Sequence, residues 1–115
     1  MVSLAVSAPQ DGGLFPGIYD LKGKRWIRSL WAPPREGYDP TRRDAYWNWS
    51  ETSAYQTAAA SVTAGYLMQY RLSCEDDPRI LPFVRRYGDF LVAEMDEDGC
   101  VPAWFDADCR PLQSL

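Results

Sequence analysis

Asp44 and Glu51 are the two carboxylates whose position in the sequence most favours a catalytic role. They flank the stretch Ala45-Tyr46-Trp47-Asn48-Trp49-Ser50, at the predicted start of a helix. Cleavage of a glycosidic bond needs one carboxylic acid to protonate the leaving oxygen and a second carboxylate to act as base or nucleophile. Both residues also suit a structural role, because Glu51 would complement a helix dipole and Asp44 would cap a turn. Asp44 and Glu51 are therefore candidate catalytic residues, and the commoner structural interpretation stays open.

An unusual number of aromatic residues surrounds these carboxylates. The chain carries 5 Trp, 7 Tyr and 4 Phe in 115 residues, and a small domain buries a limited share of its surface. Flat rings offer apolar faces to a sugar and polar edges that hydrogen-bond. Core packing accounts for part of the set. The predicted sugar-contacting residues are Trp31, Tyr46, Trp47, Trp49, Tyr55 and Trp104.

Several classes of site are excluded by composition. The chain contains no histidine, which removes the usual base of a Ser or Cys nucleophile and the commonest zinc ligand. Glycine-rich phosphate loops are absent, and we expect neither a metal nor a cofactor. Three cysteines make an odd count; Cys100 and Cys109 could pair, although small buried or half-exposed thiols are the simpler interpretation.

Charge and hydropathy limit the classes of partner that we expect this chain to bind. The net charge is −4, and the basic cluster Lys22, Lys24, Arg25 and Arg28 is too short to track a phosphate backbone, so no nucleic acid is expected. No run approaches the ~18 apolar residues of a membrane span. The apolar stretch from Met1 to Ala8 lacks the features of a signal peptide, and the compartment stays unknown.

The elements that must position these residues follow from helical periodicity and from proline and glycine. Residues 1–49 read as a long loop, with a short β-hairpin of Gly17–Leu21 and Lys24–Ile27 around Lys22-Gly23, where the glycine would supply a positive φ. Helices are predicted over 50–73 and 78–96, the second becoming regular near Ile80, and 97–115 forms a loop and tail. Together the helices make an αα-hairpin, and the fold class is mainly α.

Helical spacing also predicts which faces are buried. In the second helix the polar residues Arg85, Arg86, Asp89 and Glu94 lie off the apolar stripe. For the first helix we expect the small residues to form a narrow face for close packing, so that Gly65→Leu would disrupt the hairpin. These small residues are Ala58, Ala59, Ala60, Ala64 and Gly65. The sets expected to be buried are Tyr55, Ala59, Val62, Tyr66 and Gln69 or Tyr70 in the first helix, and Ile80 or Leu81, Val84, Tyr87, Leu91 and Met95 in the second.

Four strings carry a resemblance to a known family: Gly13-Leu14-Phe15-Pro16-Gly17-Ile18-Tyr19-Asp20, Ser53-Ala54-Tyr55-Gln56-Thr57-Ala58, the run Asp77-Pro78-Arg79-Ile80 to Leu91, and Asp98-Gly99-Cys100-Val101-Pro102-Ala103-Trp104-Phe105. Together with the Trp-rich loop between the first two, they resemble bacterial proteins of the six-hairpin glycosidase superfamily. The resemblance implies an (α/α)6 toroid, of which residues 50–105 would form one hairpin with its loop. Polysaccharide lyases share such motifs.

This resemblance implies a fragment of a carbohydrate-active, glycoside hydrolase-like protein that is inactive alone. Its partners would be a carbohydrate and the missing remainder of the toroid, or a second copy of the chain. Asp106 and Asp108 are second-rank candidates for the same end of the ring. The alternative, from a different class, is a helical-hairpin module whose exposed apolar stripe binds another protein or itself.

Overall fold

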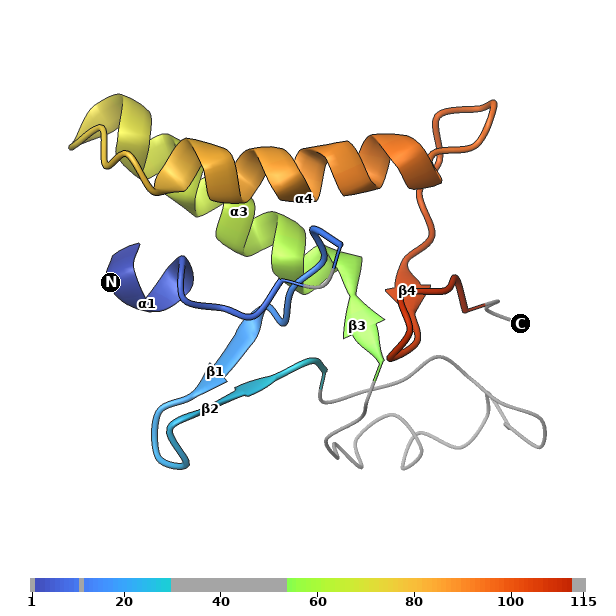
Figure 1. The fold of residues 1–115 in the computed structure, drawn as a ribbon, viewed down its shortest axis with the longest axis horizontal. Coiled ribbons are helices and arrows are strands. Elements are labelled where there is room, and N and C mark those ends of the chain that lie inside the picture. Colours follow the sequence, from blue (N-terminus) through green and yellow to red (C-terminus); the bar gives the residue numbers. More distant parts are fainter. Residues whose placement is uncertain (1, 11, 30–53, 113–115) are drawn as a thin grey trace, which may run out of the picture.

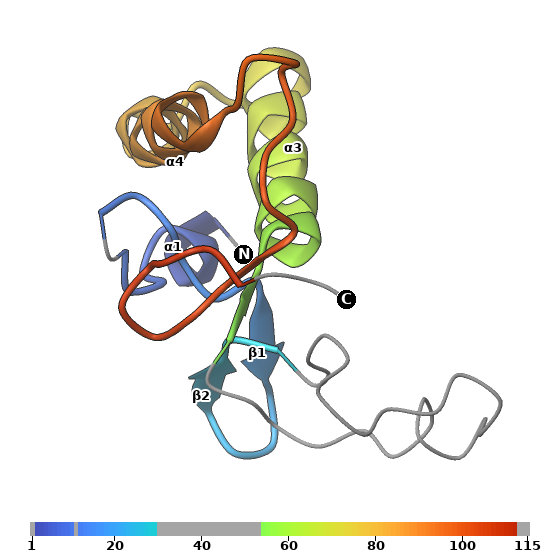
Figure 2. The same ribbon diagram turned by 90° about the vertical axis from the view of Figure 1, so that its right-hand side faces the viewer.

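Two helices, α3 (Thr57–Ser73) and α4 (Ile80–Glu94), form the largest part of the structure (Figure 1). The structure is a computed structural model and describes residues 2–10, 12–29 and 54–112. The turn from Cys74 to Arg79 joins α3 to α4, which pack on each other as the predicted αα-hairpin. Figures 1 and 2 show that the two helices cross obliquely rather than lying strictly antiparallel.

The start and end of α4 follow from local chemistry. Asp77 accepts a hydrogen bond from the backbone N–H of Arg79 at 3.0 Å, and the N–H of Ile80 donates to the Asp77 carbonyl at 3.1 Å. These bonds close the turn just before the helix, as the predicted start near Ile80 requires. After Glu94, Asp96 accepts the N–H of Asp98 and the N–H of Cys100. Gly99, with φ of 81°, takes the predicted left-handed conformation.

The first long helix begins later than predicted, at Thr57 instead of Ser50. Tyr55 and Gln56 form strand β3 (Tyr55–Gln56), which pairs antiparallel with β4 (Trp104–Phe105). The N–H of Thr57 donates to the Ala103 carbonyl at 3.0 Å, and the Thr57 hydroxyl donates to the same oxygen at 2.9 Å. Backbone groups that bond a distant strand cannot also bond the next helical turn, so the chain is extended until Thr57.

The buried face of α3 agrees with the prediction in part. Ala60 and Ala64, both predicted on the narrow packing face, are buried together with Leu67. Val62 and Tyr66, which were also expected to be buried, are 58% and 69% exposed. Gly65 is exposed and a β-carbon there would meet no atom within 4 Å, so its predicted packing role is wrong. The two alanines of this face allow α4, whose opposing face is bulky, to approach α3 closely.

That bulky face of α4 carries Ile80, Phe83 and Tyr87, all buried. The predicted Tyr87 and Ile80 are correct, while Met95 lies after the helix and is 45% exposed. The Tyr87 hydroxyl lies 2.7 Å from the Ser61 hydroxyl and donates to the Thr57 carbonyl at 3.1 Å, which ties the two helices together. Burial raises the pKa of Tyr87 above its ordinary value.

The N-terminal region contributes the centre of the core, which its assignment to a loop had not indicated. Leu14 and Phe15 are fully buried, and the Phe15 ring lies 4.8 Å from that of Phe83 and 5.2 Å from that of Tyr87. Gly17 packs directly on α3, since a β-carbon there would lie 2.5 Å from the carbonyl carbon of Ala59. The short helix α1 (Val2–Ala5) covers one side of α3 (Figure 1).

The predicted β-hairpin is present as β1 (Ile18–Asp20) and β2 (Arg25–Ile27), paired antiparallel with Tyr19 opposite Trp26. Its positive φ of 53° falls on Lys24 and not on the glycine. Gly23 lies against the Asp20 carboxylate, the flexible end of which would have to shift to make room for a β-carbon. With two small sheets beside its helices, the described part of the chain is mixed α and β rather than mainly α.

Candidate functional site

Most of the predicted site lies outside the described residues. These are the two candidate catalytic carboxylates, Asp44 and Glu51, and the sugar-contacting candidates Trp31, Tyr46, Trp47 and Trp49. Their roles stay predictions. The structure describes the residues that flank positions 30–53 in the chain, Arg28 and Ser29 before them and Ala54 and Tyr55 after them, which are called the base below.

The two sides of that stretch are buried next to each other. Ser29 is fully buried before it, and Ala54 and Tyr55 are buried after it. The Arg28 guanidinium lies 4.6 Å from the centre of the Tyr55 ring, a cation–π contact across the base. The described residues that flank positions 30–53 in the chain therefore lie at one place in the fold, where burial and the cation–π contact hold them.

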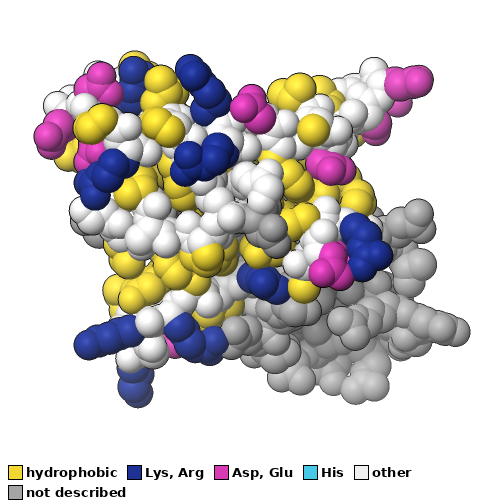
Figure 3. Space-filling model, viewed as in Figure 1, with side chains coloured by type: hydrophobic (Ala, Val, Ile, Leu, Met, Phe, Trp, Pro, Cys, Tyr) yellow, Lys and Arg dark blue, Asp and Glu magenta, His cyan; other side chains and the backbone are white. Residues whose placement is uncertain are grey.

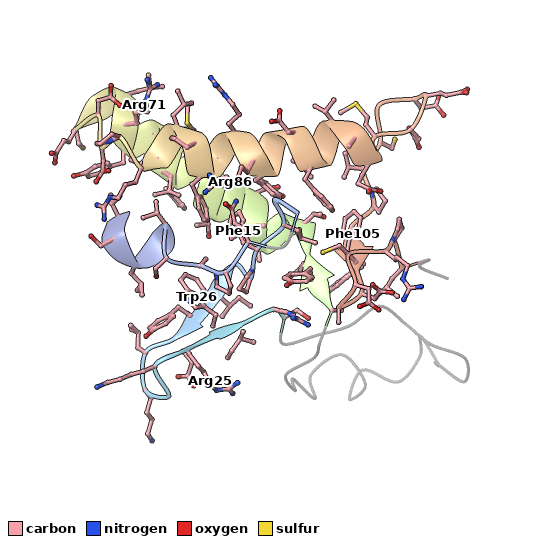
Figure 4. All side chains as sticks on the ribbon, viewed as in Figure 1. Phe15, Arg25, Trp26, Arg71, Arg86 and Phe105 are labelled. Atoms are coloured by element: carbon pink, nitrogen blue, oxygen red, sulfur yellow. The ribbon has the colours of Figure 1, made fainter. Side chains whose placement is uncertain are left out.

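Two predicted sugar-contacting residues, Tyr55 and Trp104, belong to this base and are only 3% and 6% exposed. They lie in the β3–β4 sheet, where Tyr55 pairs with Phe105 and Gln56 pairs with Trp104. Figure 4 shows Phe105 on β4, beside the base, and its ring packs on Phe90 of α4 at 5.0 Å. Both candidate rings are thus part of the support for residues 30–53 in this structure, and little of either ring is open to a sugar.

Asp106 and Asp108 lie in a tight loop just after β4. The Asp106 carboxylate accepts the N–H of Arg110 at 2.9 Å and the N–H of Asp108 at 2.8 Å. The bond from Arg110 is the main reason that the pKa of Asp106 is lowered. A carboxyl group that stays ionised is suited to act as a base and unsuited to protonate a leaving group, and here its hydrogen bonds close the loop.

A hollow of about 470 Å³, named the polar hollow after its charged residues Arg86 and Asp89, opens between α4 and the N-terminal turn. Its other lining residues are Gln10, Gly12, Gly13, Phe90 and Ala93. The Gln10 side-chain amide donates to the Gly13 carbonyl at 3.1 Å and to the Phe83 carbonyl at 3.0 Å. Its oxygen accepts a hydrogen bond from Nε of Arg86 at 2.6 Å. Figure 4 shows Arg86 between α4 and the segment that bears Phe15.

An apolar hollow of about 640 Å³ lies between α1 and α3. Val2, Ala5 and Leu67 form its apolar wall, and Tyr66, Tyr70 and Cys74 line the rest. Hydrophobic side chains reach the surface between α1 and the β1–β2 hairpin, while cationic side chains gather at the hairpin (Figure 3). Tyr66, which was predicted to be buried in the helix packing, instead lines this apolar hollow and lies outside the core.

Residues 2–10, 12–29 and 54–112 contain no group of three or more Cys, Asp or Glu placed to hold a metal ion. All three cysteines are among the described residues, and no disulfide joins Cys74, Cys100 or Cys109. Within the same ranges, no helix is both long and apolar enough to cross a membrane.

Sequence reasoning placed Arg86 and Asp89 off the apolar stripe of the second helix and assigned them no role. Periodicity gave the correct face, but only the N-terminal turn, far away in the chain, turns that face into the wall of a hollow. Comparisons of the chain with protein-family models, with curated proteins and with solved structures found no match.

Proposed function

We propose that this chain is a carbohydrate-binding part of a glycoside hydrolase-like protein, with residues 30–53 as its sugar-facing segment. The observation that supports the proposal most is the base formed by Arg28, Ser29, Ala54 and Tyr55. Both sides of the aromatic stretch are fixed there by burial and by the cation–π contact at 4.6 Å. Binding residues are commonly carried by loops on a rigid scaffold, because anchoring reduces the entropy that binding must offset.

Asp44 and Glu51 would act as acid and base in a complete protein of this kind. Hydrolysis needs the two carboxyl groups held about 5 to 9.5 Å apart across a formed cleft. The family's ring is built from six hairpins, and the described residues contain one. We therefore expect binding of sugar without turnover by this chain alone, and the remainder of a toroid as its natural partner.

The test is to measure oligosaccharide binding by the purified chain, first on a glycan array and then by calorimetry. Trp47→Ala and Trp49→Ala should each weaken binding by about tenfold or more, since loss of one stacking ring costs on the order of 1–3 kcal/mol. Tyr66→Ala is the matched control, because Tyr66 is an exposed ring on α3. Equal losses in all three variants, or no binding by the wild type, would reject the proposal.

Self-association is the second candidate function, and the exposed face of α3 favours it. Val62 is 58% exposed, Tyr66 is 69% exposed, and Tyr66 lines the apolar hollow beside α1. Large apolar side chains gathered on one face commonly mark a protein contact. Light scattering would detect a dimer that Tyr66→Ala weakens and Trp47→Ala leaves intact. The reverse dependence would count against this candidate.

A further inference from the structure

The polar hollow between α4 and the N-terminal turn holds a guanidinium that is already oriented. The side-chain amide of Gln10 donates hydrogen bonds to two backbone carbonyls, those of Gly13 and Phe83. Its oxygen is thereby fixed, and it accepts Nε of Arg86 at 2.6 Å. A planar guanidinium held at Nε keeps its two terminal nitrogens in a known plane. Those nitrogens have no hydrogen bond or ion pair within the described residues.

The second charged group of the hollow is Asp89, one turn further along α4. No ion pair joins Asp89 to Arg86 among the described residues, and the Asp89 carboxylate has no hydrogen bond there either. The hollow thus offers a set of donors and a separate set of acceptors on one wall. Phe90 adds an aromatic ring to the same lining.

A ligand that fits this arrangement must accept from a guanidinium and donate to a carboxylate. A simple anion would be repelled by Asp89, and a simple cation would be repelled by Arg86. Two neighbouring hydroxyl groups satisfy both, because a hydroxyl oxygen accepts from Arg86 while an O–H donates to Asp89. The apolar C–H face of a sugar ring would then meet Phe90.

We propose that this hollow binds the vicinal hydroxyl groups of a neutral pyranose, as a sugar contact separate from residues 30–53. The choice of a sugar rests on the proposed carbohydrate function. Arg86 and Asp89 are the binding residues, and Gln10 is a positioning residue that acts through Arg86. Gly13 keeps the turn against α4, since a β-carbon there would lie 2.9 Å from the carbonyl carbon of Arg86.

The experiment is an NMR titration of the ¹⁵N-labelled chain with methyl β-D-glucopyranoside and methyl β-D-galactopyranoside. Saturable shifts are expected at the amides of Gly12, Gly13, Asp89 and Phe90. Arg86→Gln and Asp89→Asn should each weaken binding by about tenfold, as expected for loss of a hydrogen bond to a charged group. Arg85→Gln makes the same charge change on the same helix, outside the lining, and should leave binding intact.

Two further variants distinguish loss of binding from loss of folding. If Arg86→Gln unfolds the chain, Asp89→Asn still tests sugar binding at the hollow, because the Asp89 carboxylate makes no contact on which the described fold depends. A Trp47→Ala, Trp49→Ala double variant should keep the shifts around the hollow, even where binding by residues 30–53 is lost. Absence of saturable shifts, an equal loss with Arg85→Gln, or preferential binding of sodium sulfate or glycine would overturn the proposal.

Discussion

Alanine at Gly13 should destabilise the fold far more than alanine at its neighbour Gly12. Both residues have positive φ, 106° and 62°, so both substitutions force an L side chain into an unfavourable backbone conformation. At Gly12 that is the whole effect, because a β-carbon would meet no atom within 4 Å. We expect Gly12→Ala to cost about 1 kcal/mol.

At Gly13 the new β-carbon would also overlap the Arg86 carbonyl oxygen and would lie 3.0 Å from Cβ of Phe90. The turn would have to move off α4, and the backbone of a helix cannot yield in its place. That movement would strain the bonds from Gln10 to Phe83 and from Arg86 to Gln10. Adding about 1 kcal/mol for each of the two bonds to the strain at φ gives roughly 3–5 kcal/mol for Gly13→Ala.

Urea denaturation followed by circular dichroism measures the difference, with the slope m unchanged if the compactness of the end states is unaltered. Gly13→Ala should shift the midpoint several times further than Gly12→Ala. Equal midpoints for the two variants would show that the turn does not pack on α4 as described. The polar hollow would then lose its second wall, and the proposal for Arg86 and Asp89 would fail with it.

Three more outcomes follow from individual residues. Gly65→Ala should stabilise the chain by about 0.5–1 kcal/mol in thermal unfolding, because Gly65 lies on an exposed helix face and alanine restricts the unfolded chain; a loss of stability would restore a packing role. Tyr87→Phe should cost about 1–2 kcal/mol by removing the bonds to Ser61 and Thr57. Because the pKa of Tyr87 is raised above 10.0 in the fold, its contribution is complete below pH 10 and declines above it, and alkaline denaturation of Tyr87→Phe should lack that decline. The hydrogen bond from Arg79 lowers the pKa of Asp77 from 3.8 to about 2, so its stabilisation is complete above pH 4 and is lost as the pH falls toward 2; a carboxyl ¹³C titration that is unchanged in Arg79→Met would contradict this.

The turns that separate the helices and strands were predictable, because a turn depends on a few neighbouring residues. Asp77 and Pro78 precede α4, Gly99 closes the loop after it, and the hairpin turns where Lys22-Gly23 predicted. Even there, packing assigned the details. The positive φ belongs to Lys24, while Gly23 lies against the Asp20 carboxylate.

The buried face of α3 was predicted only in part, because two apolar stripes compete on the helix and the expected burial included residues of both. One stripe holds Val62 and Tyr66, the other Ala60, Ala64 and Leu67. Apolarity alone favours the first stripe. The large residues Phe15, Phe83 and Tyr87 occupy the space beside α3, so only the stripe of small residues can approach them, and a tyrosine tolerates water at its hydroxyl.

The sequence by itself determined the turn of the β1–β2 hairpin, the start of α4 and the loop after it, since capping, turn formation and helical periodicity act over a few residues. Tertiary structure alone decided that Tyr55 extends into a strand, that Phe15 joins the core, and that Gln10 orients Arg86. Those outcomes need partners far along the chain, as with Gln10 and Arg86, whose positions differ by 76. Local sequence patterns cannot predict such contacts, because a segment keeps the same helical or strand periodicity whichever distant segment packs against it.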